Sequence, residues 1–448
     1  MSSNLDAAIR SCRYVALHVT DYCNLQCRYC FEAAPAMPKK SDPCQRFMEL
    51  EVATRTVERI VSECSADHVD VLLFGGEPLL IGMDWLETAI EAFRASAKAH
   101  GKTLKIAMTT NATAVNTGVA RRLRAAEVGV CVSIDGPPDI HDLSRGGAKS
   151  MLKGIAALKE AGIALNTICV VNPHNGEHIE EILLFLLDLG ITKGRFTPMT
   201  YAGSASHGFE FDDINMPIRA VMQVLEHMLD TQGSGFVDLP LMRRVAHYAA
   251  DRIGLSLNQQ DYDCYTKTCW AGAGYLAVSG DGALYPCSRC VESEYQMGHL
   301  DGDGQASTLG QLERLHSVGM EAFHCNACPA RAICFGGCAA HNKADVRNFE
   351  LDCALTRALF AAFEENSDKV LALHHALYGR HNGVGDDLAS DAEALHILDV
   401  LQKTKMTPMI AKHGGVILSN GMDNYLIDPA NGDACAVTDD GVAELMKS

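Results

Sequence analysis

Three cysteines stand close together near the start of the chain, at the spacing Cys-x-x-x-Cys-x-x-Cys. They are Cys23, Cys27 and Cys30, and they follow the apolar, β-rich run Tyr14–Thr20. A zinc site normally takes four protein ligands, and no fourth Cys or His follows at the spacing of a zinc finger. Three thiolates suit a [4Fe–4S] cluster better, because such a cluster then keeps one iron open for another molecule. The triad therefore predicts an iron–sulfur cluster with an open coordination site.

A second and denser group of cysteines occupies the middle of the chain. Its members are Cys264, Cys269, Cys287, Cys290, Cys325, Cys328, Cys334, Cys338 and Cys353. A zinc ribbon could explain one Cys-x-x-Cys pair but not this density, and grouped cysteines in a reducing compartment indicate metal ligands rather than disulfides. The remaining cysteines are scattered, and we expect buried free thiols at Cys12, Cys44, Cys64, Cys131, Cys169 and Cys435.

Polar residues and glycines punctuate the ends of several expected strands. Gly75 and Gly76 would let the backbone approach a ligand closely, and Glu77 could accept a hydrogen bond from an ammonium group. Further along lie Thr109-Thr110-Asn111, Ser133-Ile134-Asp135-Gly136-Pro137 and Arg145. Asp135 is equally well explained as a turn residue before Gly-Pro.

The elements that must position these residues alternate between strand and helix. Strands are predicted at 14–20, 68–74, 105–110, 129–135, 165–171 and 194–200, and helices at 49–63, 83–99, 117–126, 149–161, 178–189 and 217–231. Alternation of this kind indicates a parallel sheet with right-handed crossovers. Six units predict a partial (β/α)6 barrel of the α/β class, in which chemistry collects at the carboxyl ends of the strands.

Composition narrows the function classes further. The chain has 448 residues, which is too long for one ordinary core, and a net charge of −18, which argues against a general nucleic-acid binder. No apolar run approaches bilayer length, and the N-terminus lacks a signal-peptide pattern. We therefore expect a cytoplasmic protein with no nucleic-acid partner and no membrane partner.

The first cysteine motif resembles that of the radical S-adenosylmethionine (SAM) family. The resemblance implies that Cys23, Cys27 and Cys30 hold a [4Fe–4S] cluster, that SAM binds its open iron, and that electron transfer yields a 5′-deoxyadenosyl radical. It implies SAM contacts at Tyr29, Gly75, Gly76, Glu77, Thr110, Ser133, Arg145 and Val170.

The second group resembles the SPASM domain of radical SAM peptide-modifying enzymes. Residues 275–278 and 283–285 predict a hairpin around Gly280-Asp281-Gly282, and Cys287 follows Gly282 after four intervening residues. The resemblance implies two auxiliary [4Fe–4S] clusters, which makes three in all. Auxiliary cluster I would use Cys264, Cys269, Cys287 and Cys338, and auxiliary cluster II would use Cys325, Cys328, Cys334 and Cys353. Cys290 could instead replace Cys287 or Cys264, or be a spare thiol.

The predicted domains are a radical SAM partial barrel (1–231), a helical linker (232–260), a SPASM domain (261–370) and a C-terminal appendage (371–448). In the appendage we expect a helix that continues from 354 to 378, a linker at 379–387, helices at 391–403 and 439–446, and strands at 415–418, 424–427 and 433–437. Three small strands and a helix faintly resemble modules that bind leader peptides, although a small lid or packing appendage is the favoured interpretation.

The favoured function is a radical SAM/SPASM peptide maturase that crosslinks or oxidises a side chain of a precursor peptide or protein. A flavodoxin or ferredoxin is the expected electron donor. An anaerobic sulfatase maturase is a second candidate, but Ser288 stands where that family has an aspartate, so Glu292 or Cys290 would have to act. A third is a radical SAM enzyme that acts on a small molecule or a cofactor precursor. A fourth is an iron–sulfur redox carrier, although a carrier has no need of the SAM contacts.

Overall fold

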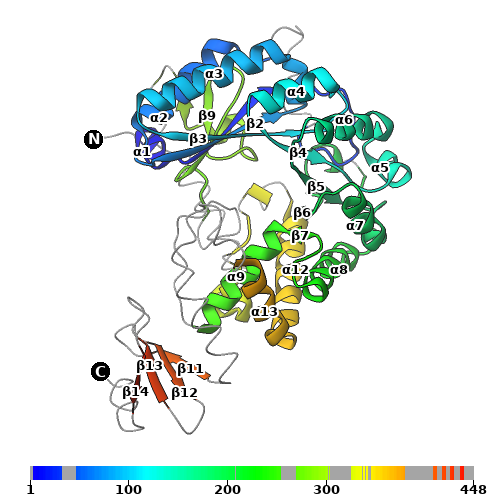
Figure 1. The fold of residues 1–448 in the computed structure, drawn as a ribbon, viewed down its shortest axis with the longest axis vertical. Helices are drawn as coiled ribbons and strands as arrows, with labels where there is room; N and C mark the ends of the chain where they lie inside the picture. The colour runs from blue at the N-terminus through cyan, green and yellow to red at the C-terminus, as the bar shows by residue number, and fades with distance from the viewer. Residues whose placement is uncertain are drawn as a thin grey trace.

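The computed structural model describes residues 4–32, 47–206, 208–253, 269–300, 302, 324–334, 336–338, 340–341 and 345–378, together with four short strands beyond residue 400. Its main feature is a ten-stranded sheet with the order β10-β9-β8-β1-β2-β3-β4-β5-β6-β7. All neighbours from β8 to β7 run parallel, while β9 and β10 are antiparallel additions. The sheet is an open arc rather than a closed barrel (Figure 1), which confirms the predicted α/β class.

The strands of this sheet agree closely with the sequence prediction. They are β1 (Tyr14–Thr20), β2 (His68–Gly75), β3 (Thr103–Thr110), β4 (Gly129–Ser133), β5 (Leu165–Val171), β6 (Lys193–Pro198), β7 (Val237–Asp238), β8 (Tyr275–Val278), β9 (Ala283–Tyr285) and β10 (Gly298–His299). The predicted fourth strand ends two residues too late: β4 ends at Ser133, although Ile134 N still donates to Ile168 O of β5 at 3.0 Å. The predicted hairpin is confirmed by β8 and β9.

Helices follow the strands in alternation. They are α1 (Asn4–Ser11), α2 (Leu50–Glu63), α3 (Met83–Ala99), α4 (Thr117–Ala125), α5 (Pro138–Ser144), α6 (Ala148–Glu160), α7 (Ile179–Asp188), α8 (Asn215–Thr231), α9 (Leu239–Ile253), α12 (Val346–Glu365) and α13 (Ser367–Tyr378). Asn116 caps α4, since its side chain accepts from Val119 N at 3.0 Å, and Gly101 adopts positive φ just after α3.

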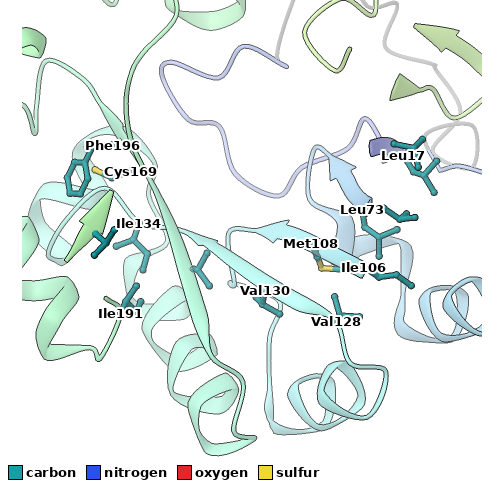
Figure 2. Packing of buried hydrophobic residues seen from close by; sticks show 14 of the residues in the cluster. Leu17, Leu73, Ile106, Met108, Val128, Val130, Ile134, Cys169, Ile191 and Phe196 are labelled. Carbon is teal, nitrogen blue, oxygen red and sulfur yellow. The ribbon is translucent and has the colours of Figure 1, made fainter. Parts of the chain in front are cut away.

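The core lies between the sheet and its outer helices. Alternate residues of β1 (Val15, Leu17 and Val19) belong to this core, whereas Ala16 packs in a separate cluster on the opposite face with Ala277 and Tyr285. Figure 2 shows the core side chains following the strands one after another, from Leu17 to Phe196. The carboxyl ends of the parallel strands are thereby fixed along one edge of the sheet.

The region after residue 231 contains more regular structure than a linker. β7 extends the sheet beside β6, and α9 packs on α13. β8 pairs in parallel with β1, so residues of the predicted SPASM segment continue the barrel sheet directly. The predicted domain boundaries stay predictions.

The prediction of one helix from 354 to 378 was wrong in detail. α12 begins earlier, at Val346 after the capping residue Asp345, and the helix breaks at Asn366 before α13. Beyond it, β11 (Thr407–Ile410), β12 (Val416–Ser419), β13 (Asn424–Ile427) and β14 (Ala434–Val437) form an antiparallel sheet, of which β11 was not predicted. The predicted linker at 379–387 and helices at 391–403 and 439–446 lie outside the described residues.

Within the described part of the chain, no helix combines the length and the apolar character that a bilayer-spanning segment needs.

Candidate functional site

The loop after β1 holds Cys23, Cys27 and Cys30 at the carboxyl edge of the sheet. Two side-chain donors approach their sulfurs: Asn111 Nδ2 lies 3.8 Å from Cys23 Sγ, and Arg145 Nη1 lies 4.0 Å from Cys27 Sγ. Burial raises the pKa of both thiols, and these two donors oppose the rise. The two donors therefore offset part of the cost of burying negative charge on these sulfurs, as hydrogen bonds to cluster ligands do.

Gly75 and Gly76 hold this loop in place rather than leaving space beside it. Gly76 N donates to Thr20 O at 2.8 Å, and Glu77 N donates to Tyr22 O at 2.9 Å. A Cβ added at Gly75 would lie 2.1 Å from Thr20 O, and one at Gly76 would lie 2.3 Å from Tyr22 O. The paired glycines are thus required by the close contact of two backbones, next to the first cysteine.

Glu77 is a buried carboxylate with a nearly complete set of donors. Its exposed fraction is 1%, and it accepts from Thr110 Oγ1 at 2.7 Å, Asn111 N at 2.7 Å and Leu79 N at 3.2 Å. Burial raises the pKa of Glu77, while these hydrogen bonds oppose the rise. The side chain is therefore fixed in one position beside the cysteine loop.

Asp135 is the site residue that sequence reasoning left undecided, and the structure places it at the centre of a network. The residue is fully buried, its carboxylate accepts from Tyr29 Oη and from Val170 N, and Arg145 Nε lies 3.0 Å from its Oδ2. The Arg145 contact is an ion pair rather than a well-aligned hydrogen bond. The Arg145 guanidinium also lies 5.3 Å from the ring centre of Tyr29. A turn aspartate would be solvated, so this burial is what sequence alone could not reveal.

The expected SAM contacts therefore gather in one region. Tyr29, Arg145 and Val170 meet around Asp135, while Thr110 and Glu77 bond to each other, and Ser133 is buried at the end of β4. Their roles toward SAM stay predictions. Asn111, which the sequence marks only as a polar residue at the end of a strand, also approaches Cys23 Sγ through its Nδ2.

The four cysteines predicted for auxiliary cluster II share one cavity. Cys325, Cys328, Cys334 and Cys353 all line a space of about 250 Å³, although Cys353 comes from α12 and the others from a loop. Burial raises the pKa of Cys353, and the neighbouring Cys334 and Cys328 add to the rise.

The group predicted for auxiliary cluster I is described in part. Cys287 and Cys338 pack against a small buried cluster that contains Cys290. A hydrogen bond to Cys290, together with burial, raises the pKa of Cys287. Burial also raises the pKa of Cys269, and the neighbouring Cys287 adds to that rise. Cys264 lies outside the described residues, and Glu292, the candidate acid, is exposed.

Among the described residues, no three His, Cys, Asp or Glu side chains converge as ligands of one metal ion. The ligands of a four-iron cluster are spread around a much larger body, so a cavity lined by four thiols agrees with the cluster prediction.

Comparison with known proteins identifies the first part of the chain. Residues 17–186 match the family model described as the Radical SAM superfamily, so this part of the chain is a radical SAM domain. Members of this family bind SAM and a [4Fe–4S] cluster.

Relatives of known name extend the similarity beyond that domain. The chain is 24% identical over 338 residues to the serine-type anaerobic sulfatase-maturating enzyme of Klebsiella pneumoniae, which covers 73% of this chain and 81% of the enzyme. The solved structure of native anSMEcpe with bound AdoMet has a TM-score of 0.66 at 19% identity, and covers 82% of this chain and 99% of its own. The structure of Streptococcus suis SuiB bound to precursor peptide SuiA has a TM-score of 0.55 at 16% identity. The match covers 75% of this chain and 74% of the SuiB chain. At these identities, the solved structures support the fold alone.

Proposed function

We propose that the protein is a radical SAM/SPASM peptide maturase. The observation that carries the proposal is the junction of the two cysteine groups: β8, in the segment of the second group, pairs with β1, which leads into the first. A carrier of electrons would need the thiols but not the buried Glu77 and the Asp135–Arg145 pair at the same edge of the sheet.

The residues present fit the cofactors that this proposal requires. Cys23, Cys27 and Cys30 would hold the first cluster, and Asn111 and Arg145 would stabilise its thiolates. Together with SAM, this cluster supplies a 5′-deoxyadenosyl radical that takes a carbon-bound hydrogen from the substrate. Glu77, fixed by three donors, presents its charge to the SAM ammonium group, and Asp135 holds Tyr29 and Arg145 in position beside it.

The auxiliary cysteines would hold two further [4Fe–4S] clusters. Cys325, Cys328, Cys334 and Cys353 line one cavity and would form one set. Cys269, Cys287 and Cys338 would form the other set, which Cys264, outside the described residues, would complete. Such clusters supply redox centres whose potentials depend on burial and hydrogen bonds. A flavodoxin or ferredoxin in the cytoplasm would deliver the electron that SAM cleavage consumes.

The proposed substrate is a precursor peptide or protein, which becomes crosslinked or oxidised at a side chain. The names of the relatives support this class, since one is a sulfatase-maturating enzyme and SuiB was solved with a precursor peptide. Formylglycine formation is the second candidate. Where the sulfatase maturases are expected to have an aspartate, this chain has Ser288, whose hydroxyl accepts a hydrogen bond from Tyr275 Oη at 2.7 Å, so an acidic base is missing at that position.

Mass spectrometry on an anaerobic reaction tests the proposal. The reaction contains the reconstituted enzyme, SAM, dithionite and short peptides encoded beside its gene. We expect 5′-deoxyadenosine together with a peptide that has lost two hydrogen atoms. Cys27→Ala should abolish 5′-deoxyadenosine formation, whereas Cys131→Ala, which removes a thiol on β4 outside the cysteine groups, should not. 5′-Deoxyadenosine without any peptide change would contradict the peptide substrate, and its absence would contradict the radical SAM chemistry.

A further inference from the structure

A small buried polar cluster lies between the two cysteine groups and has no role in the site described above. It is formed by His18 on β1, Glu32, which stands two residues after Cys30, and Arg289, which stands two residues after Cys287. His18 Nδ1 lies 3.7 Å from Glu32 Oε2, and both side chains are largely buried, with exposed fractions of 8% and 16%.

Aromatic rings connect these groups through a series of ring contacts. The His18 ring packs edge-on against Phe74, with 5.1 Å between the centroids, and Phe74 stacks on Phe31 at 6.4 Å. The Arg289 guanidinium lies 4.6 Å from the centre of the Phe31 ring, and its Nη1 donates to Thr200 Oγ1 at 3.1 Å. The cluster thus connects the ends of β1, β2 and β6 with the segment after β9.

Two polar atoms in this cluster are buried without a hydrogen-bond partner: Glu32 Oε1 and His18 Nε2. Unpaired buried polar atoms cost free energy, so such a pair indicates a missing partner. Glu32 Oε1 is an acceptor when the carboxylate is ionised. Burial lowers the pKa of His18 to about 4, so its ring is neutral, and a proton on Nδ1 toward Glu32 leaves Nε2 as an acceptor too.

The charges around Glu32 restrict what this partner can be. Glu32 Oε1 and His18 Nε2 lack a partner on the same buried His18–Glu32 pair, so the missing group must donate hydrogen bonds. A carboxylate or phosphate ligand offers only acceptors and would be repelled by an ionised Glu32, whereas a cation would be attracted. A single hydroxyl could satisfy only one acceptor. An ammonium or guanidinium group carries positive charge and several N–H donors on one centre.

We propose that Glu32 and His18, framed by Phe31 and Phe74, form a binding site for a basic side chain, lysine or arginine, of the peptide substrate. The inference rests on the proposed function and names a specificity site within it. Glu32 follows the first cysteine loop, and Arg289 follows Cys287. A peptide anchored here would therefore lie between these two segments.

Fluorescence anisotropy on the anaerobic holoenzyme with SAM tests this site directly. The probes are fluorescein-labelled pentapeptides Gly-Gly-Lys-Gly-Gly, in which the lysine is kept, acetylated or replaced by norleucine. We expect the lysine probe to bind at least tenfold more tightly than the other two, and Glu32→Gln to remove this preference. Glu51→Gln, which changes an exposed glutamate on α2, should keep it.

A second variant guards against a merely structural effect at Glu32. His18→Asn should also reduce the preference for lysine, with the iron content and far-UV circular dichroism of both variants unchanged. Equal affinity for lysine and norleucine probes, absence of binding, or a preference that survives Glu32→Gln would overturn the proposal. The 5′-deoxyadenosine assay on the same samples reports on the proposed function separately, since probe binding does not require SAM cleavage.

Discussion

At the scale of single residues, the site depends on buried charges whose partners are supplied by the backbone or by neighbouring strand ends. Glu77 and Asp135 are both almost inaccessible, yet each accepts hydrogen bonds from main-chain N–H groups, Asn111 N and Val170 N respectively. Glu77 follows β2 and its donor Asn111 follows β3, while Asp135 follows β4 and its donor Val170 lies in β5. Each carboxylate therefore links two neighbouring strands. The same contacts therefore stabilise the fold and fix the side chains that we propose to contact SAM.

Glu77→Gln is expected to weaken SAM binding at least tenfold. The glutamine amide has one acceptor oxygen for the three donors that now face Glu77, and its NH2 group would oppose either Asn111 N–H or Leu79 N–H. An unsatisfied buried donor costs about 1–3 kcal/mol. Isothermal titration of SAM into the anaerobic enzyme measures the change, and Glu91→Gln on the exposed face of α3 is the matched control. An unchanged SAM affinity would count against the role of Glu77.

How far the sequence predicts this site differs from residue to residue. The cysteines and Glu77 are recognisable because their spacing along the chain carries the signal. Asp135 is not, because its partners Tyr29, Arg145 and Val170 are distant in sequence, and only the fold brings them together. The glycines have a further requirement that the sequence does not reveal: Gly76 packs against Tyr22 O of the cysteine loop, and that contact depends on how two strand ends meet. Their contact with SAM stays a prediction.

At the scale of elements, the parallel strands were predictable and the additions to the sheet were not. Strands β1 and β5 agree residue for residue with the predicted ranges, because buried parallel strands are continuous β-branched and apolar runs bounded by turns. β7 has only two residues, and β8 pairs with β1, which lies far earlier in the chain. Local patterns contain no information on such long-range pairing.

The helical layer of α9 and α13 should make the protein sensitive to acid through His374. Burial lowers the pKa of His374 to about 4, and its Nδ1 has no hydrogen-bond partner. Since the ordinary pKa is 6.5, the unfolded chain binds this proton more tightly, and stability falls as the pH drops from 6.5 toward 4. The complete effect is about 3 kcal/mol.

His374→Phe is expected to reduce this loss, since phenylalanine keeps the stacking on Tyr378, where the ring centroids are 4.7 Å apart, and cannot titrate. Thermal unfolding at pH 7.5 and pH 5 measures the result: the melting temperature of the variant should fall less than that of the wild type. An exposed histidine after α3 provides the control, and His100→Gln should behave like the wild type. An equal fall in all three proteins would refute the assignment to His374.

At the scale of the whole molecule, the radical SAM domain and the second cysteine group form one continuous structure. The sheet passes from β7 through β1 to β10 without interruption, and Tyr201, just after β6, is held by Asn348 of α12 through Tyr201 N and Asn348 Oδ1 at 2.8 Å. A cluster that Cys353 of α12 helps to hold would thereby be fixed relative to the strand ends. This arrangement would keep the distance between the cysteine groups constant during a reaction.

Cys325→Ala and Cys353→Ala should therefore have the same effect, although the two residues lie on different elements. Both thiols line the cavity of about 250 Å³, so loss of either should remove auxiliary cluster II, about four irons per chain. Because the first cysteine loop is remote from this cavity in the chain and is held by Gly75 and Gly76, SAM cleavage should continue while peptide product is lost. Iron analysis, 5′-deoxyadenosine yield and peptide mass measure the three quantities, with Cys131→Ala as the control. Normal product formation in either variant would exclude an electron-transfer role for this cluster, and a different iron content in the two variants would show that the four cysteines do not bind one cluster.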